Sequence, residues 1–425
     1  MIDPRALQTR REEIAESCRR RGVSVDLDAL LALQQRVSEL QTRLDRANRR
    51  RKEHQAAGRR PLPEAERRAH AEEGRRLKAE VQELEAELSR IRREFEERLR
   101  AVPNFLHPEV PEGGEDDYRV IRQVGEPPRF DFEPLDHLEI GRRLDLFDFE
   151  GGARVAGQKW VYLKNEAVLL ELALQRFALD RLIRDGFTPL LTPDVARPEI
   201  VEGIGFNPRG EETQIYTLEN ANLCLIGTAE ITLGGLYADH IFDDADLPLR
   251  LAGVSHCFRT EAGAAGRESK GLYRVHQFTK VEMFAFTRPD ESDQMHEQLL
   301  ALEESIFRDL EVPYRVIDVA SGDLGAPAYR KFDIEAWMPG RGEAGDWGEV
   351  TSTSNCTDYQ ARRLRIRYRR KDGRGNECVH MLNGTAVAIS RTLIPLLENH
   401  QCADGSVRIP KALAPYVGVD VIGPR

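Results

Sequence analysis

The sequence predicts an α+β protein, in which a domain built on a mainly antiparallel sheet follows an N-terminal hairpin of two α-helices. Three observations lead to this class. Apolar residues recur every 3.5 positions through much of the first hundred residues, and the repeat then stops. Prolines and glycines cluster at 103–114, as in a linker. Strand-like and amphipathic segments alternate beyond it, so we expect domains at 1–105 and 106–425.

Two heptad seams define the N-terminal region. The first consists of Leu30, Leu33, Val37, Leu40, Leu44 and Ala47. The second consists of Leu77, Val81, Leu84, Leu88, Ile91 and Phe95. Gly58, Pro61 and Pro63 lie between them and break the helix, because proline lacks an N–H donor and clashes with the preceding turn. Two seamed helices around one break predict an antiparallel coiled-coil hairpin over about 27–100.

The tip of this hairpin is basic. Its cations are Arg43, Arg46, Arg49, Arg50, Arg51, Lys52, Arg59 and Arg60. Only Asp45 and Glu53 oppose them, whereas arginines that merely solubilise a helix alternate with glutamates, as they do at 72–98. Residues 1–110 carry a net charge of +4 and the remainder −14. The pattern favours binding to nucleic-acid phosphates, and a dimerising coiled coil or a plain solvated face are the alternatives.

The remainder of the chain mixes short strands with amphipathic helices. Strand character is concentrated at 224–226, 249–254, 279–286 and 314–319. Helical patterns cover 166–184, 290–310 and 386–399. This mixture is typical of an antiparallel sheet covered by helices.

Several classes of protein and site are excluded or disfavoured. No run of 18 apolar residues is present, so we expect no membrane span, and the N-terminus does not resemble a signal or transit peptide. Six cysteines without a CxxC pair indicate a reducing, cytoplasmic setting. Residues 340–345 match GxGxxG by letter, but Pro339 precedes them and strand-like residues follow in place of a helix. Cys356, Cys378 and His380 match no zinc spacing, which favours structural thiols over a metal site.

Residues 257–284 read as a strand, a glycine-rich loop and a second strand. Arg259 and Glu261 are expected on one face at the end of the first strand, and Phe278, Lys280 and Glu282 on one face of the second. Such a floor offers a guanidinium to phosphate, carboxylates to amines and an aromatic ring to a base. The alternative is an ordinary hairpin with a mobile polar loop.

This segment resembles motif 2 of class II aminoacyl-tRNA synthetases, in the form found in seryl-tRNA synthetases. Residues 226–230 resemble that family's TAE motif, 348–363 its metal-binding strand and adjoining turn, 382–399 motif 3, and 186–193 motif 1. Motif 3 usually has a glycine where this chain has Ser390. The motifs occur in the family's order and span essentially the whole chain.

The resemblance implies a class II catalytic domain and a tRNA-binding helical arm. It implies ATP-dependent activation of L-serine to seryl-adenylate and transfer of the seryl group to tRNA(Ser), with tRNA(Sec) as a second acceptor in many relatives. ATP and Mg²⁺ are the implied cofactors, the basic arm grips the tRNA, and the motif 1 proline lies at a homodimer interface. Two rivals remain, a paralogue that loads a carrier protein and an inactive RNA-binding homologue.

Site residues carry over position by position, as what the resemblance implies. The catalytic set is Arg259, Arg391 and Glu349. Serine would be bound by Thr228, Ala229, Glu230, Arg259, Glu282 and Thr385, with Glu282 and Thr385 receiving its hydroxyl. ATP would be bound by Arg259, Thr260, Glu261, Arg274, Val275, Phe278, Glu349, Val350, Thr351, Ser352 and Arg391. Mg²⁺ would be held with ATP by Glu349 and Ser352.

Overall fold

The computed structural model describes residues 1–59, 63–206, 214–262 and 270–424. Two compact units make up the chain, an N-terminal unit of Met1–Phe105 and a C-terminal unit of Leu106–Arg425. Arg60 and Pro61, which belong to the predicted basic tip and helix break, lie outside the described residues. Among the helices within these ranges, none combines the length and apolarity needed to cross a membrane.

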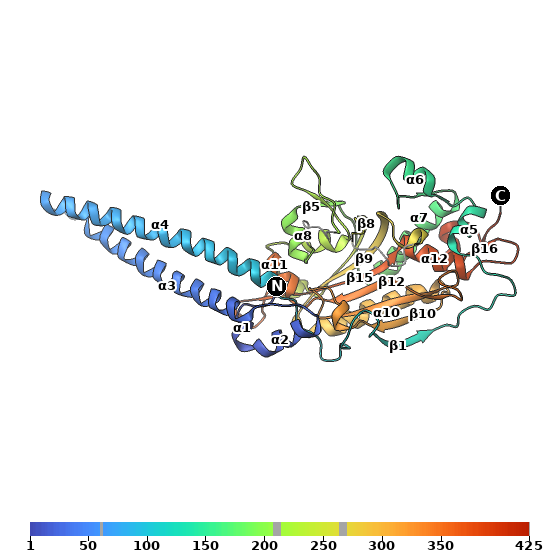
Figure 1. The fold of residues 1–425 in the computed structure, drawn as a ribbon, viewed down its shortest axis with the longest axis horizontal. Coiled ribbons are helices and arrows are strands. Elements are labelled where there is room, and N and C mark those ends of the chain that lie inside the picture. The colour runs from blue at the N-terminus through green and yellow to red at the C-terminus, as the bar shows by residue number, and fades with distance from the viewer. Residues whose placement is uncertain (60–62, 207–213, 263–269, 425) are drawn as a thin grey trace. The chain divides into compact units, whose positions relative to one another are not determined.

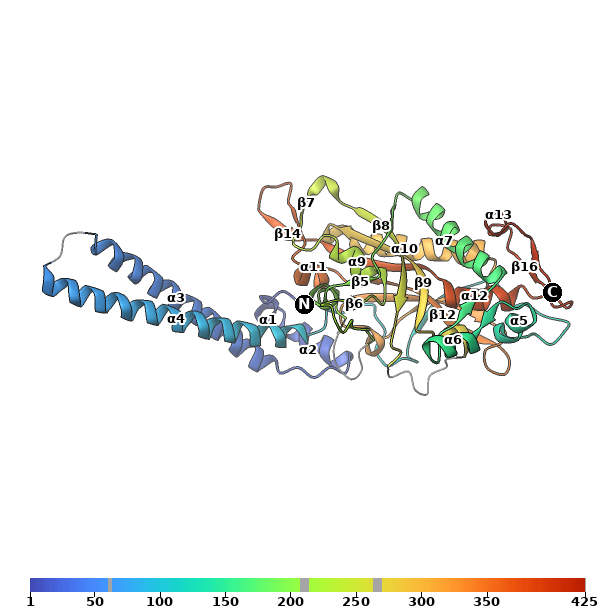
Figure 2. The same ribbon diagram turned by 90° about the horizontal axis from the view of Figure 1, so that it is seen from above.

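The N-terminal unit contains the predicted helical hairpin. Its helices are α1 (Ala6–Thr9), α2 (Arg11–Arg20), α3 (Leu27–Ala57) and α4 (Glu64–Arg100). Helices α3 and α4 lie side by side and run in opposite directions (Figures 1 and 2), and we call this pair the helical arm. The Asp26 carboxylate begins α3 by accepting a hydrogen bond from the Ala29 N–H, which satisfies a donor that the first helical turn leaves unpaired.

The two heptad seams meet between α3 and α4, as predicted. Leu40, Leu44 and Ala47 pack against Val81, Leu84, Leu88 and Ile91, and Leu33 and Val37 are partly buried beside them. Ion pairs join the helices outside the seam, at Arg36–Glu87 and Arg50–Glu80, each with an N–O distance of 2.6 Å. The seam residues are apolar, so the arm is held mainly by burial of hydrocarbon, with exposed ion pairs contributing little.

An eight-stranded sheet organises the C-terminal unit, in the order β1-β10-β11-β12-β15-β9-β8-β4. Its strands are β1 (Arg119–Val124), β4 (Thr188–Leu191), β8 (Leu249–Phe258), β9 (Gln277–Thr287), β10 (Tyr314–Asp318), β11 (Arg330–Met338), β12 (Asp346–Asn355) and β15 (His380–Ala388). All neighbours pair antiparallel except β4 and β8, which are parallel. The predicted antiparallel α+β architecture is therefore confirmed.

Shorter elements complete the unit. The helices are α5 (His137–Arg143), α6 (Phe149–Ala156), α7 (Glu166–Arg184), α8 (Pro198–Ile204), α9 (Ala229–Gly235), α10 (Ser292–Asp309), α11 (Tyr359–Leu364), α12 (Ile389–Asn399) and α13 (Ala414–Val417). The minor strands are β2 (Phe147–Asp148), β3 (Tyr162–Leu163), β5 (Val195–Ala196), β6 (Cys224–Leu225), β7 (Ile241–Asp243), β13 (Arg367–Arg369), β14 (Asn376–Cys378), β16 (Val407–Arg408) and β17 (Val421–Ile422). Short 3₁₀ turns lie at Asp244–Asp246, Gly271–Tyr273 (η2), Pro289–Glu291 and Ser321–Asp323.

Alternation along β9 explains how the sheet carries both a core and a site. Val281, Met283 and Ala285 join a large core that also includes residues of α7, α10 and α12. Phe284 and Phe286 point to the other face, where they pack with residues of α8, α9 and α11. Successive side chains of a strand point to opposite faces, so Phe278, Lys280 and Glu282 share the face of Phe284.

The structure corrects three boundaries. Strand β8 ends at Phe258, so Arg259 and Glu261 follow the strand, and Glu261 adopts a left-handed φ of 52°. The prediction that strand alternation places Arg259 and Glu261 on one face is therefore wrong, because neither residue belongs to the strand. Residues 386–388 belong to β15, so α12 begins only at Ile389, and α10 begins at Ser292 after a 3₁₀ turn.

Candidate active site

A cleft of about 400 Å³ opens beside strands β9, β12 and β15 and the beginnings of α9 and α12. The predicted site residues that line it are Thr228, Glu230, Arg259, Glu261, Arg274, Val275, Phe278, Glu282, Glu349, Val350, Thr351, Ser352, Thr385 and Arg391. Ala229 and Thr260 are not among the described lining residues. Ala229 is fully buried at the start of α9, where its side chain packs toward Gly253.

One part of the cleft is lined by two carboxyls, the buried Glu282 and the half-buried Glu230. Together with Lys280 and Thr385 we call them the carboxyl cluster. Glu282 on β9 stands directly opposite Thr385 on β15, with 3.5 Å between the Thr385 hydroxyl and the carboxylate. The Lys280 ammonium forms an ion pair with the same carboxylate and lies 3.4 Å from the Thr385 hydroxyl. Burial raises the pKa of Glu282, and Lys280 offsets part of that rise.

Glu230, the other carboxyl of the cluster, accepts two hydrogen bonds from side-chain amides. The Gln360 amide donates to its Oε1 at 2.7 Å and the Asn383 amide at 2.9 Å. Burial, together with repulsion from Glu282, raises the pKa of Glu230 to about 7. A cation bound beside this carboxyl would favour its ionised form.

Guanidinium groups dominate the rest of the cleft, and we call Arg259, Arg274, Arg391, Glu261 and Glu349 the arginine cluster. The Arg259 guanidinium carbon lies 5.3 Å from the centre of the Phe278 ring, and its Nε donates to the Gly227 carbonyl at 3.3 Å. Arg274 forms an ion pair with Glu261 at 3.2 Å. Cations beside an aromatic plane suit an anionic ligand that also carries a flat base.

A bulge in β12 brings the remaining polar residues to the cleft. Glu349 pairs with Glu335 and Thr351 with Ile334, so Val350 is an extra residue without a partner. Glu349 and Ser352 consequently both line the cleft, although they are three positions apart. Glu349 forms an ion pair with Arg391 at 2.9 Å. Burial opposes ionisation of Glu349, but Arg391, Lys331 and Arg259 outweigh it and lower its pKa.

Comparison with known proteins matches both units. The model of the "Seryl-tRNA synthetase N-terminal domain" matches residues 1–106, and that of the "tRNA synthetase class II core domain (G, H, P, S and T)" matches 216–400. The serine–tRNA ligase of Rhodopirellula baltica is 54% identical over 423 residues, which cover 99% of each chain. This chain belongs to the seryl-tRNA synthetase family. The serine–tRNA ligase of Rubrobacter xylanophilus is also 54% identical, over 100% of this chain and 99% of its own.

A solved member of the seryl-tRNA synthetase family shares the whole fold. The seryl-tRNA synthetase of Pyrococcus horikoshii, in complex with ATP, superposes with a TM-score of 0.90 at 38% identity, and 100% of both chains is covered. The resemblance seen in the motifs is therefore confirmed across both units, and the chain is a class II synthetase.

In this synthetase, the structure also identifies cleft residues that sequence reasoning gave no role. Lys280, Lys331, Tyr273 and Asn383 line the cleft, and Gln360 reaches Glu230 from α11. Strand alternation places Lys280 on the face of Phe278 and Glu282, but it gives the ammonium no role. Gln360 gives no local signal, because its contact with Glu230 joins positions 130 residues apart in the sequence.

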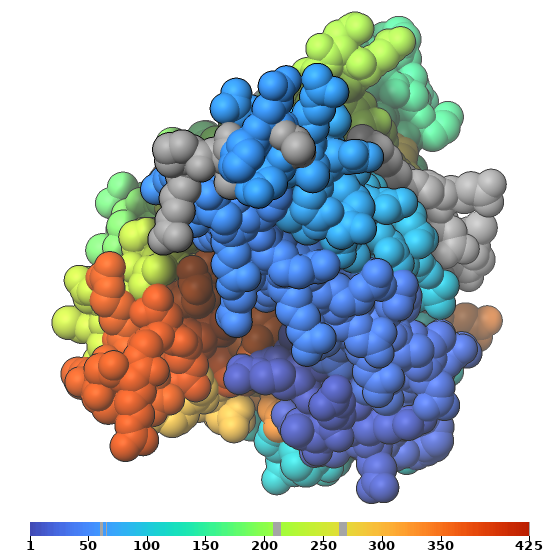
Figure 3. Space-filling model, turned by 90° about the vertical axis from the view of Figure 1, so that its left-hand side faces the viewer, coloured from blue at the N-terminus to red at the C-terminus, as the bar shows by residue number. Residues whose placement is uncertain are grey.

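The basic residues of the helical arm are mostly exposed. Arg43, Arg46, Arg49, Arg50, Lys52 and Arg59 are exposed and Arg51 is half-buried. Figure 3 faces the tip, where side chains of α3 and α4 project into solvent. Arg50 is paired with Glu80, whereas Arg43, Arg46 and Arg49 form no ion pair with another described residue. Unpaired, exposed guanidiniums on one surface are suited to phosphate contacts.

Proposed function

We propose that this synthetase activates L-serine with ATP and transfers the seryl group to tRNA(Ser). The observation that carries the proposal is the joining of two chemistries in one cleft, a carboxyl cluster suited to a small amino alcohol and an arginine cluster suited to a nucleotide. The family membership of both units points to the same reaction.

Serine would occupy the carboxyl cluster. Its ammonium group would ionise Glu230 and contact the Thr228 hydroxyl, and its hydroxyl would donate to Glu282 beside Thr385. Lys280 favours the ionised state of Glu282, and an ionised carboxylate can only accept hydrogen bonds. A site with such a buried acceptor rejects alanine, because the acceptor would be left without its partner.

ATP would occupy the arginine cluster. Arg259 would bind the α-phosphate and the serine carboxylate, Arg391 the γ-phosphate, and Phe278 would stack on adenine, with Glu261 accepting from the adenine amino group. A serine carboxylate oxygen attacks the α-phosphorus and pyrophosphate leaves, which needs alignment and charge neutralisation more than a protein nucleophile. A ribose hydroxyl of the tRNA then attacks the seryl carbonyl carbon and loses its proton, the seryl–phosphate bond breaks, and AMP leaves.

Glu349 and Ser352 fit a Mg²⁺ ion that arrives with ATP. Their oxygens both reach the cleft because of the Val350 bulge, and Mg²⁺ prefers hard oxygen ligands from one or two side chains plus phosphates and water. The ion would supply charge neutralisation at the phosphates. Arg391 would exchange its contact with Glu349 for a phosphate when the nucleotide binds. Within the described ranges, no group of three His, Cys, Asp or Glu side chains forms a separate metal site.

We also propose that the helical arm binds tRNA and that the C-terminal unit forms a homodimer. Exposed, unpaired arginines on α3 support the first proposal. The second is supported by β4, an edge strand of the large sheet, whose Leu191 is 85% exposed. Nearby in sequence, α7 exposes Val168, Leu169 and Leu172, which is unusual for large apolar side chains in a monomer.

The test combines two assays on the purified full chain. Serine-dependent exchange between ATP and pyrophosphate measures activation, and radiolabelled serine with a tRNA(Ser) transcript measures transfer. We expect both activities, with alanine giving little exchange. Exchange without transfer would instead indicate a paralogue that loads a carrier, and the absence of both would indicate an inactive RNA-binding homologue.

A further inference from the structure

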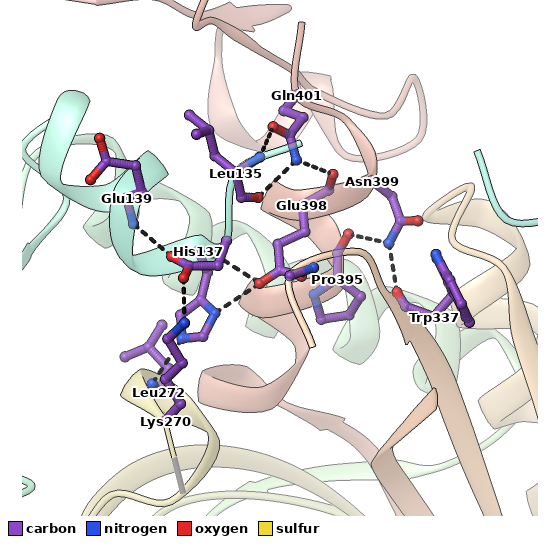
Figure 4. A network of polar contacts seen from close by, with 12 residues as sticks. Leu135, His137, Glu139, Lys270, Leu272, Trp337, Pro395, Glu398, Asn399 and Gln401 are labelled. Atoms are coloured by element: carbon purple, nitrogen blue, oxygen red, sulfur yellow. Dashed lines mark hydrogen bonds and ion pairs between the residues drawn. The ribbon is translucent and has the colours of Figure 1, made fainter. Parts of the chain in front are cut away.

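Behind the arginine cluster, a buried network joins three separate segments to the end of α12 (Figure 4). The Glu398 carboxylate, 1% exposed, accepts hydrogen bonds from the His137 backbone N–H and from His137 Nδ1, both at 2.9 Å, and from the Gly340 N–H at 2.8 Å. Three donors satisfy this buried charge, so it needs no cation in contact. Neither Glu398 nor His137 lines the cleft.

The other ring nitrogen of His137 fixes its protonation state. His137 Nε2 lies 3.3 Å from the Leu272 backbone N–H, which can only donate, so Nε2 accepts and carries no proton. Nδ1 therefore carries the proton and donates a hydrogen bond to Glu398. The imidazole bridges a buried carboxylate to the backbone of η2.

A second contact holds the same segment. The Lys270 ammonium forms an ion pair with Asp136 at 2.5 Å, next to His137 in the chain. Gly271 has a left-handed φ of 58°, and a Cβ there would meet His137 Nε2 at 2.2 Å, so only glycine allows the backbone this close to the ring. Residues 136–137 thus clamp residues 270–272 from two sides.

The clamped segment leads directly into the arginine cluster. The Tyr273 carbonyl lies 3.4 Å from Arg391 Nε, and the Tyr273 ring lies 4.7 Å from the Arg391 guanidinium and 4.8 Å from that of Arg341. Arg274 follows and pairs with Glu261. The position of this backbone therefore sets how Arg391 and Glu261 are presented to the cleft.

We propose that His137 and Glu398 are positioning residues for ATP: their buried pair fixes residues 270–274 and, through Tyr273 and Arg274, orients Arg391 and Glu261. The inference rests on the proposed function for the identity of the nucleotide. It assigns this role to two residues outside the cleft. His137 lies in no motif, and the motif resemblance gives Glu398 no role.

Two substitutions of His137 test its two hydrogen bonds separately, the one to Glu398 and the one from the Leu272 N–H. His137→Asn keeps a donor near Nδ1 for Glu398 but loses the acceptor for the Leu272 N–H. His137→Gln places an amide oxygen near Nε2 and keeps that acceptor. We expect His137→Asn to weaken ATP binding roughly five- to tenfold, as the loss of one buried hydrogen bond does. The ATP affinity of His137→Gln should remain closer to that of the wild type. Calorimetric titration with ATP in the absence of serine measures both.

Two further variants guard against a merely structural effect. His400 is an equally buried histidine, whose Nε2 contacts the Leu310 carbonyl away from the clamp, so His400→Asn should leave ATP affinity unchanged. Lys270→Met removes the exposed half of the clamp and should weaken ATP roughly two- to threefold without unfolding the chain. The KM for serine in the exchange assay should hardly move in the His137 and Lys270 variants.

The inference is overturned if His137→Asn and Lys270→Met bind ATP as tightly as wild type, or if His400→Asn weakens ATP to the same extent. Because ATP binding is measured without serine, this outcome is distinct from a failure of the proposed function. If the wild-type chain binds ATP but shows no serine-dependent exchange between ATP and pyrophosphate, only the proposed function is overturned.

Discussion

The helical arm and the C-terminal unit bury different kinds of side chain. Between α3 and α4 the buried residues that the structure describes are apolar, from Leu40 to Ile91. The C-terminal unit also buries Glu282, Glu303, Glu304 and Glu398. A buried carboxyl lowers the free energy of unfolding unless it has hydrogen-bonding or ionic partners. Stability alone therefore does not explain the buried carboxyls of the C-terminal unit. The seam of the arm is therefore apolar, whereas the C-terminal unit also buries carboxyls, which are unfavourable to bury without partners.

The largest expected effect tests whether the arm depends on its seam alone. Leu40 is fully buried, so Leu40→Ala should cost the arm about 2–5 kcal/mol of unfolding free energy through lost transfer energy and a cavity. Hydrogen exchange should accelerate in α3 and α4, while serine-dependent exchange of pyrophosphate stays unchanged. Leu236→Ala, at a side chain that is 57% exposed in the other unit, is the matched control and should do neither.

The next effect probes the carboxyl cluster. Glu282→Gln should lower kcat/KM for serine about a hundredfold, which corresponds to about 3 kcal/mol of transition-state stabilisation. It should also reduce the preference for serine over alanine. Both substitutions, Glu282→Gln and Glu282→Ala, remove the carboxylate that pairs with the buried Lys280 ammonium. Glutamine keeps the shape of the side chain and an oxygen that can accept a hydrogen bond from Lys280, whereas alanine keeps neither. Exchange assays with both amino acids measure the effect. Wild-type serine kinetics in Glu282→Gln would contradict the assigned role.

A smaller effect concerns the exposed arginines of the arm. Replacing Arg43, Arg46 and Arg49 together by serine should weaken tRNA(Ser) binding roughly tenfold or more and flatten its dependence on salt, because fewer counterions are released. Activation of serine should be unaffected. Arg76, which is paired with Glu73, offers a control on α4, and Arg76→Ser should change the salt slope much less. An unchanged slope in the triple variant would leave the arm without a role in binding tRNA.

The smallest effect is a pH dependence. The pKa of Glu230 is about 7, and in the proposed function its ionised form would bind the serine ammonium. Serine affinity should therefore rise about tenfold from pH 6 to pH 8, as the ionised fraction grows. Titration of serine binding across this range measures the rise. Glu230→Gln should bind weakly at every pH, and a slope that persists in this variant would assign the titration to another group.

The contrast between the units also decides what could be predicted from sequence. The arm follows from a local repeat, so its seam residues were identified from spacing alone. Strand alternation within residues 257–284 predicts part of the cleft, including Glu282, but only motif resemblance joins this hairpin to Thr228 and Arg391, which come from distant segments. The extra residue at Val350 leaves no signature in the sequence, since only the pairing of β12 with β11 reveals it. Glu261 was expected on a strand face but lies beyond the end of β8, because that strand ends at Phe258.

The buried carboxyls have a consequence for the thermodynamics of the free protein. Burial raises the pKa of Glu230, Glu282, Glu303 and Glu335 above the unfolded values. Each then holds its proton more tightly when folded, so its contribution to stability is greatest below about pH 4.5 and is lost as pH rises through the folded pKa. At neutral pH the burial of these carboxyls therefore lowers the free energy of unfolding. A bound ammonium group relieves this deficit at Glu230, so serine should protect the chain against heat more strongly at pH 8 than at pH 6.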